Sequence, residues 1–191
     1  MKKDIILAGV GGQGILSIAA IIGYAAVESG LHLKQAEVHG MSQRGGDVQS
    51  HLRISDQEIF SDLIPLGGAD LIISVEPMEA LRYIPYLSEQ GWLITNTKTF
   101  ENIPNYPAKD ALLKEIDSHP RNVALDAEEI AKELGSNRMM NMVMLGAASP
   151  FLELDYAKLK AGISFIFGRK GEKVVESNLS AMSAGKEISK K

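Results

Sequence analysis

The sequence predicts a three-layer α/β/α fold with a mainly parallel sheet, which a β-hairpin makes mixed, followed by a helical C-terminal third. An apolar run at 5–8 leads directly into a glycine-rich segment, GVGGQG, and then into a stretch with helical spacing. Further short apolar runs alternate with helical stretches as far as residue 135, as in sheets that helices cover on both faces. Beyond residue 138 only helical patterns occur.

The first strand and helix lie on either side of the glycines. The strand, at about 3–8, carries an uninterrupted apolar run, which is typical of a strand that is covered on both faces. Apolar residues then recur at helical spacing and predict a helix over 14–29, which Gly30 ends as a cap. A second strand follows at 33–38.

A β-hairpin is predicted next. Apolar and polar residues alternate over 48–54, a turn at Ser55 and Asp56 follows, and a short run occupies 58–61. Two such runs joined by a turn predict a pair of antiparallel strands.

The remaining elements continue the alternation. Strands are predicted at 70–75, 92–95 and 122–125; Pro77 opens a short helix, and Asp126 with Glu129 forms a capping box for a helix that ends before Gly135. Helices are then expected over 138–148 and 156–167, and a last one presents Val175, Leu179 and Met182 on one face. We expect a single domain over 1–186 and a disordered tail over 187–191.

Composition excludes several classes of protein. The 191 residues carry a net charge of −4, which argues against a nucleic-acid backbone as the main partner. No apolar run approaches the roughly 20 residues of a membrane span, and a strand at the start leaves no room for a signal peptide, so a cytoplasmic location is expected. The chain has no cysteine and four scattered histidines, so no iron–sulfur cluster or metal site of its own is expected.

The glycine segment is the first candidate ligand site. Glycines followed by a helix N-terminus favour phosphate binding, because the backbone approaches an anion closely and N–H groups point at it. Glu37 lies 23 residues after Gly14 and is placed to bind a ribose, as in dinucleotide-binding folds. A tight turn that merely permits close packing and an adenylating enzyme remain alternatives. The candidate residues are Gly9, Gly11, Gly12, Gln13 and Gly14.

The segment HGMSQRGGD, residues 39–47, is the second candidate site. It lies after a strand, so we expect it at the carboxyl edge of the sheet, near the first glycine turn. Arg44 is a candidate clamp for a phosphate or carboxylate, although an exposed surface turn is the alternative. The candidate binding residues of this segment are Ser42, Gln43, Arg44, Gly45 and Gly46.

Other conspicuous residues have structural interpretations. His39 and His51 flank the second segment and lack a paired carboxylate, so structural roles are expected for both. Core packing is expected for four methionines, Met139, Met140, Met142 and Met144. No nucleophile–base pair or metal triad is evident, and no catalytic residue is predicted.

Five segments in order resemble the gamma-type domain of 2-oxoacid:ferredoxin oxidoreductases. They cover nearly the whole chain: GVGGQG, EVHGMSQRGGDVQSHLRI, DLIISVEPMEALR, NMVMLGA and GEKVVESNLSAM. Within this family the motif HGMSQRGG is most similar to that of the small, or beta, subunits of the indolepyruvate branch. Pyruvate and 2-oxoglutarate relatives more usually carry Tyr-Gly-Pro, and Glu or Met before Arg-Gly-Gly, at this place.

The resemblance implies a subunit of an enzyme that converts an aryl 2-oxoacid, CoA and oxidised ferredoxin to an aryl-acetyl-CoA, carbon dioxide and reduced ferredoxin. It implies that thiamine diphosphate and 4Fe–4S clusters lie on a large alpha subunit, which agrees with the lack of cysteine here. The chain alone is then expected to hold no cofactor and to be inactive, with its two glycine segments capping the active-site region or holding the CoA phosphates. A stand-alone NAD or NADP dehydrogenase and a nucleotide-sensing module remain open.

Overall fold

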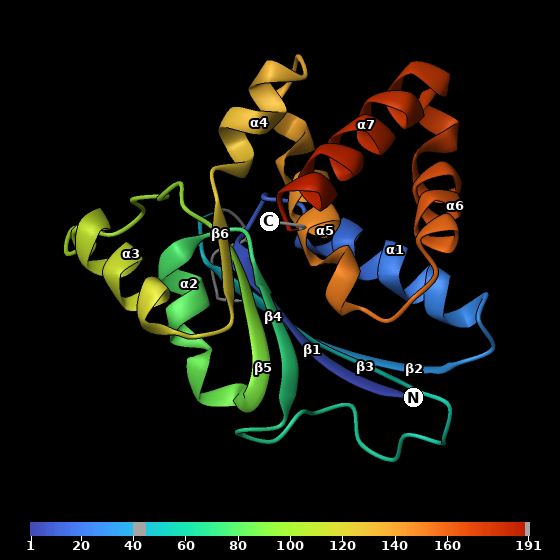
Figure 1. Cartoon of the computed structure of the whole chain (residues 1–191), viewed down its shortest axis with the longest axis horizontal. Coiled ribbons are helices and arrows are strands. Elements are labelled where there is room, and N and C mark those ends of the chain that lie inside the picture. The colour runs from blue at the N-terminus through green and yellow to red at the C-terminus, as the bar shows by residue number, and fades with distance from the viewer. Residues whose placement is uncertain (40–44, 190–191) are drawn as a thin grey trace.

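The computed structural model describes residues 1–39 and 45–189, and its centre is one six-stranded mixed sheet (Figure 1). The strands lie in the order β2-β3-β1-β4-β5-β6. β1, β4, β5 and β6 are parallel, whereas β3 is antiparallel to both β1 and β2. The predicted mixed sheet is therefore confirmed. The bounds are β1 Lys2–Val10, β2 His32–His39, β3 Asp47–Ser55, β4 Ala69–Ser74, β5 Leu87–Asn96 and β6 Asn122–Leu125.

β3 does form a hairpin, but the strand with which it pairs was predicted wrongly. β3 pairs with the preceding strand β2, from His32 opposite Ser55 to His39 opposite Val48, and not with 58–61. Because β1 pairs along the other edge of β3, neither edge of β3 is left for residues 58–61. Those residues belong to a long irregular connection between β3 and β4.

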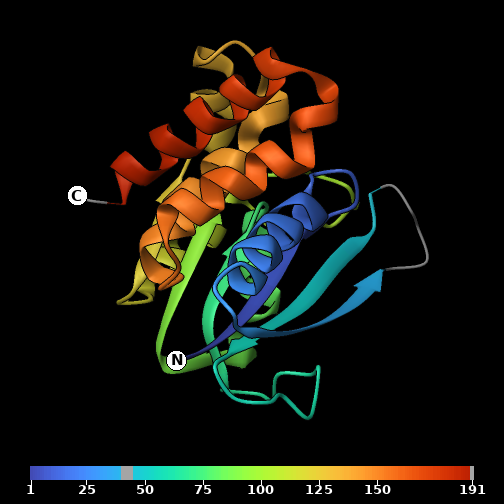
Figure 2. The same ribbon diagram turned by 90° about the vertical axis from the view of Figure 1, so that its right-hand side faces the viewer.

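Helices cover both faces of the sheet, which confirms the three layers. In Figure 1, α1, α5, α6 and α7 lie on one face and α2 and α3 lie on the other, and Figure 2 views the molecule from the side of α1 and α6. Two separate apolar cores correspond to these faces. The bounds are α1 Ile15–Val27, α2 Pro77–Arg82, α3 Lys109–Ser118, α4 Ala127–Glu133, α5 Met140–Ala148, α6 Tyr156–Phe167 and α7 Glu172–Ile188, with 3-10 turns η1 Ile84–Tyr86, η2 Asn137–Met139, η3 Ser149–Phe151 and η4 Gly168–Lys170.

The helix ends follow the chemistry of their flanking residues. The carboxylate of Asp126 accepts a hydrogen bond from the Glu129 N–H at 2.9 Å and starts α4, and Gly30 ends α1 with a φ of +72°. α7 extends through Ile188 and so includes the first two residues of the predicted tail, and 190–191 lie outside the described residues. Over 1–39 and 45–189, no helix has the length and apolar character of a membrane span.

Candidate functional site

The candidate site lies where the sheet changes its winding direction. From β1 the chain passes to α1 on one face, and from β4 it passes to α2 on the other, although β1 and β4 are adjacent parallel strands. Ligands of open α/β sheets bind outside the carboxyl ends of the strands at such a point. The GVGGQG turn follows β1 at this edge, so the predicted glycine site and the topology agree in position.

The glycine turn is fixed by hydrogen bonds of its own. The Gln13 side-chain oxygen accepts from the Val10 N–H at 2.8 Å, and the Gln13 N–H donates to the Val10 carbonyl at 3.1 Å. The Gly11 N–H donates to the Gly46 carbonyl at 2.8 Å. The N–H groups of Gly11 and Gln13 are therefore used within the protein and are not available to a ligand.

Three positions of the turn require glycine, each for a different physical reason. A Cβ on Gly9 would overlap the side chain of Val75, at the end of β4. Gly12 has a φ of +100° with open space around it, so its backbone is accessible. Gly14 has a φ of +82°, and its Cβ would lie 2.5 Å from the side-chain nitrogen of Asn141 in α5.

The second glycine segment meets the first, as expected. Besides the bond between Gly46 and Gly11, the Asn102 side chain donates to the Gly45 carbonyl at 2.6 Å. Gly45 and Gly46 are thus attached to the 97–108 loop and to the glycine turn, respectively. The predicted binding residues Ser42, Gln43 and Arg44 lie outside the described residues.

A pocket of about 380 Å³ opens beside the glycine turn, and we call it the ligand pocket. Its basic group is Arg138, which is exposed and follows the Ser136-capped turn η2. Glu128 also lines the pocket, but Lys132 neutralises it through an ion pair at 3.2 Å. The charge of Arg138 therefore gives this part of the surface a net positive charge. The lining residues are Gly12, Gln13, Phe100, Glu128, Asn137, Arg138, Met140 and Asn141.

Sequence reasoning did not single out Arg138, because it lies 124 residues after Gly14 and only the fold brings the two together. The link is Asn141, whose side-chain nitrogen donates to the Gly14 carbonyl at 3.1 Å and holds α5 against the turn. A run of two donors, Asn137 and Arg138, directly before the methionine-rich helix was the available signal.

Glu76 is a second residue that sequence reasoning did not single out. Its carboxylate is fully buried at the carboxyl end of β4, where it accepts from the Glu79 N–H at 2.9 Å and starts α2. The same carboxylate accepts from the Phe100 N–H at 3.2 Å and from the Tyr106 hydroxyl. Burial, and then the hydrogen bond to Glu76, raise the pKa of Tyr106, so this hydroxyl stays protonated and donates.

The other highlighted residues are structural. The His51 side chain is 4% exposed and its Nδ1 accepts from the Ile64 N–H at 3.0 Å; burial lowers its pKa, which favours the neutral acceptor form. Nothing is described of the His39 side chain. Met139, Met142 and Met144 are buried, as core packing requires, and Met140 packs partly buried beside them.

The ribose-binding role considered for Glu37 does not fit the topology. Glu37 lies on β2, and β3 separates that strand from β1. In a dinucleotide-binding fold the second strand lies directly beside the first, which brings its carboxylate to the ribose. The stand-alone dehydrogenase is therefore not supported. Over 1–39 and 45–189, no three His, Asp or Glu side chains are grouped as a metal site would need.

Fold and site together define a mixed α/β protein with a glycine-rich turn and a pocket at the topological switch point of its sheet. Residues 4–188 match the model of the pyruvate ferredoxin/flavodoxin oxidoreductase family, and the chain belongs to this family. The family that the five sequence segments predicted is thereby confirmed.

Three known proteins illustrate the relationship. The indolepyruvate oxidoreductase subunit IorB of Archaeoglobus fulgidus is 37% identical over 97% of this chain and 94% of its own length. That of Thermococcus kodakarensis is 36% identical over 100% and 98%. A 2-oxoglutarate:ferredoxin oxidoreductase from Magnetococcus marinus, with 2-oxoglutarate, coenzyme A and succinyl-CoA bound, matches with a TM-score of 0.81 at 25% identity, over 99% of this chain and 31% of the other.

Proposed function

We propose that this chain is the small subunit of a 2-oxoacid:ferredoxin oxidoreductase that acts on indolepyruvate or another aryl 2-oxoacid. The main support is the similarity to IorB subunits along nearly the full length of both chains. In the proposed reaction the bond between the carboxylate and the oxo carbon breaks and carbon dioxide leaves. The acyl group forms a thioester with CoA, and two electrons pass to ferredoxin.

The redox groups belong to a partner in this proposal. Iron–sulfur clusters need cysteine thiolates as ligands, and this chain has no cysteine, so its residues do not fit such a cluster. We assign the clusters and thiamine diphosphate to a large alpha subunit, and the chain alone is then inactive. Ferredoxin reaches the assembled complex through that subunit.

The chain's own contribution is to position CoA. Gly12 and Arg138 border one pocket, and a backbone N–H beside a helix N-terminus and a guanidinium both favour an anion. We propose that this pocket holds a phosphate group of CoA, and that Ser42, Gln43 and Arg44 of the neighbouring hairpin connection complete it. Holding the phosphate directs the CoA thiol toward the acyl group on the partner.

Affinity isolation of the chain from anaerobic extract tests the proposed function. We expect a larger, cysteine-rich partner to be recovered with it. The recovered complex should reduce ferredoxin with indolepyruvate in the presence of CoA, faster than with pyruvate or 2-oxoglutarate. The proposal would be contradicted if the chain were recovered alone and no neighbouring gene encoded a cysteine-rich protein.

Arg138→Ala tests the anion site. Loss of one charge-assisted contact costs about 1.5–3 kcal/mol, so we expect the KM for CoA of the assembled enzyme to rise about tenfold or more. The value of kcat should change little, because the chemistry lies on the partner.

Arg169→Ala is the matched control, because Arg169 is also exposed but lies in η4, outside the residues that line the pocket. An unchanged KM for CoA in both Arg138→Ala and Arg44→Ala, with assembly intact, would refute the anion site while leaving the proposed function standing.

A further inference from the structure

The connection between β3 and β4, residues 56–68, exposes large apolar side chains, and we call it the apolar loop. Phe60, Leu63 and Leu66 are 86%, 55% and 69% exposed. The loop lies below the sheet in Figure 1, at the edge where β4 begins, and the ligand pocket lies at the edge where β4 ends. It is therefore a surface separate from the candidate site.

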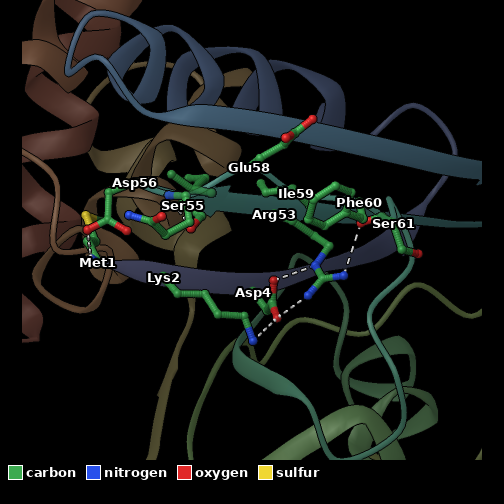
Figure 3. Close-up of a pocket in the computed structure, with 12 residues that line it drawn as sticks. Met1, Lys2, Asp4, Arg53, Ser55, Asp56, Glu58, Ile59, Phe60 and Ser61 are labelled. Atoms are coloured by element: carbon green, nitrogen blue, oxygen red, sulfur yellow. Dashed lines mark hydrogen bonds and ion pairs between the residues drawn. The ribbon is translucent and has the colours of Figure 1, made fainter.

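Polar side chains of the sheet hold the backbone of this loop. Arg53 donates through Nη1 to the carbonyls of Ser61 and Leu63, at 3.1 and 3.0 Å. The same guanidinium binds Asp4, which is 1% exposed, through Nε at 2.7 Å and Nη2 at 3.0 Å. Figure 3 shows Arg53 between Asp4 and the loop.

A second anchor lies further along the loop. The Ile64 N–H donates to His51 Nδ1, and the Ile64 side chain is only 2% exposed. The exposed side chains at 60, 63 and 66 therefore project from a backbone that is fixed on both sides of Leu63. Such pre-ordering lowers the entropy cost of binding and suits a docking element.

A pocket of about 580 Å³ lies between this loop and the beginning of β1. Its wall includes the loop residues Glu58, Ile59 and Phe60 and the strand residues Lys2, Asp4 and Arg53 (Figure 3). An apolar rim beside a hollow is the shape that accepts a side chain from a partner surface.

Charge identifies the kind of partner. Glu58 and Asp62 are exposed beside Phe60. A two-fold contact between two copies of this chain through the loop would bring these carboxylates toward their own counterparts, which is unfavourable. A surface with an apolar patch bordered by Lys or Arg complements the loop better than a second copy does.

The comparisons indicate where such a surface belongs. In the oxidoreductase of Magnetococcus marinus, the counterpart of this whole chain is 31% of one longer chain, so the same fold is there a part of a larger enzyme polypeptide. We propose that the apolar loop docks this chain onto the large subunit of the proposed oxidoreductase, at an apolar patch bordered by basic side chains. The inference rests on the proposed function for the identity of that subunit.

Phe60→Ser tests the docking surface. Removing an exposed aromatic anchor should raise the Kd for the purified large subunit about tenfold or more, as measured by calorimetry. The fold should be unaffected because Phe60 is 86% exposed. Glu58→Lys should also weaken binding and should reduce its dependence on salt.

Phe165→Ser is the matched control, since Phe165 is a 69% exposed aromatic on α6, on the face of the sheet that α1 and α6 cover. Its Kd should stay within about threefold of the wild type. If wild type binds and Phe60→Ser binds equally well, the docking surface is refuted and the proposed function stands. If the wild type does not bind at all, both fail. A wild-type dimer that Phe60→Ser converts to monomers would assign the loop to a second copy and overturn the inference.

Discussion

Replacing Gly185 with alanine is expected to lower the free energy of unfolding by about 3 kcal/mol. Gly185 lies in α7 where that helix touches α5, and a Cβ there would overlap the Val143 carbonyl oxygen. Gly146 of α5 is in the reciprocal position, because its Cβ would overlap the Met182 carbonyl oxygen. The two helix backbones are therefore in direct contact, and a methyl group can be admitted only by separating them.

Alanine has a higher helix propensity than glycine, by about 1 kcal/mol. This gain opposes the loss from the steric overlap but is smaller than that loss. Gly168→Ala separates the two effects, because Gly168 has a helical φ of −54° and no atom within 4 Å of a built Cβ. That variant should be neutral or slightly stabilised, by about 0.5 kcal/mol. Urea unfolding followed by circular dichroism measures all three variants. Wild-type stability in both Gly185→Ala and Gly146→Ala would show that the helices do not pack this closely.

The fold was largely predictable because its elements carry local signals. Pro77, Asp126 and Gly30 mark helix ends through chemistry that acts within a few residues, and the structure confirms all three. The hairpin partner was not predictable in the same way. The alternation over 48–54 indicates a strand, but the choice between 32–39 and 58–61 depends on which edges β1 occupies, and this is a property of the whole sheet.

The site was predictable only in part, for a similar reason. Glycines reveal a turn that approaches an anion, and strand order places Gly46 beside Gly11, as observed. Arg138 and Glu76 gave no comparable signal. Arg138 reaches the pocket from a turn far along the chain. Glu76 follows β4 but acts through the loop that follows β5. Single charged residues are common on any surface, so only the assembled fold distinguishes these two.

Glu76→Ala is expected to destabilise the protein by about 3 kcal/mol, since buried donors that lose their acceptor cost about 1–3 kcal/mol each. The donors are the N–H groups of Glu79 and Phe100 and the hydroxyl of Tyr106. Two of them belong to the 97–108 loop, which supplies Phe100 to the ligand pocket and Asn102 to the Gly45 carbonyl. The same change should therefore loosen the loop and the wall of the pocket.

Amide hydrogen exchange separates these two consequences. In Glu76→Ala we expect faster exchange over 97–108 and at Gly45 and Gly46, and a raised KM for CoA in the assembled enzyme. Tyr106→Phe is the graded control: it removes one donor and leaves the carboxylate bonded to Phe100, so its loss of stability should be only about 1 kcal/mol. If Glu76→Ala lowers stability but leaves exchange over 97–108 unchanged, Glu76 serves only to start α2, and the loop is held by other contacts. If exchange rises while the KM for CoA does not, the loop is tied to Glu76 as described but does not shape the CoA site.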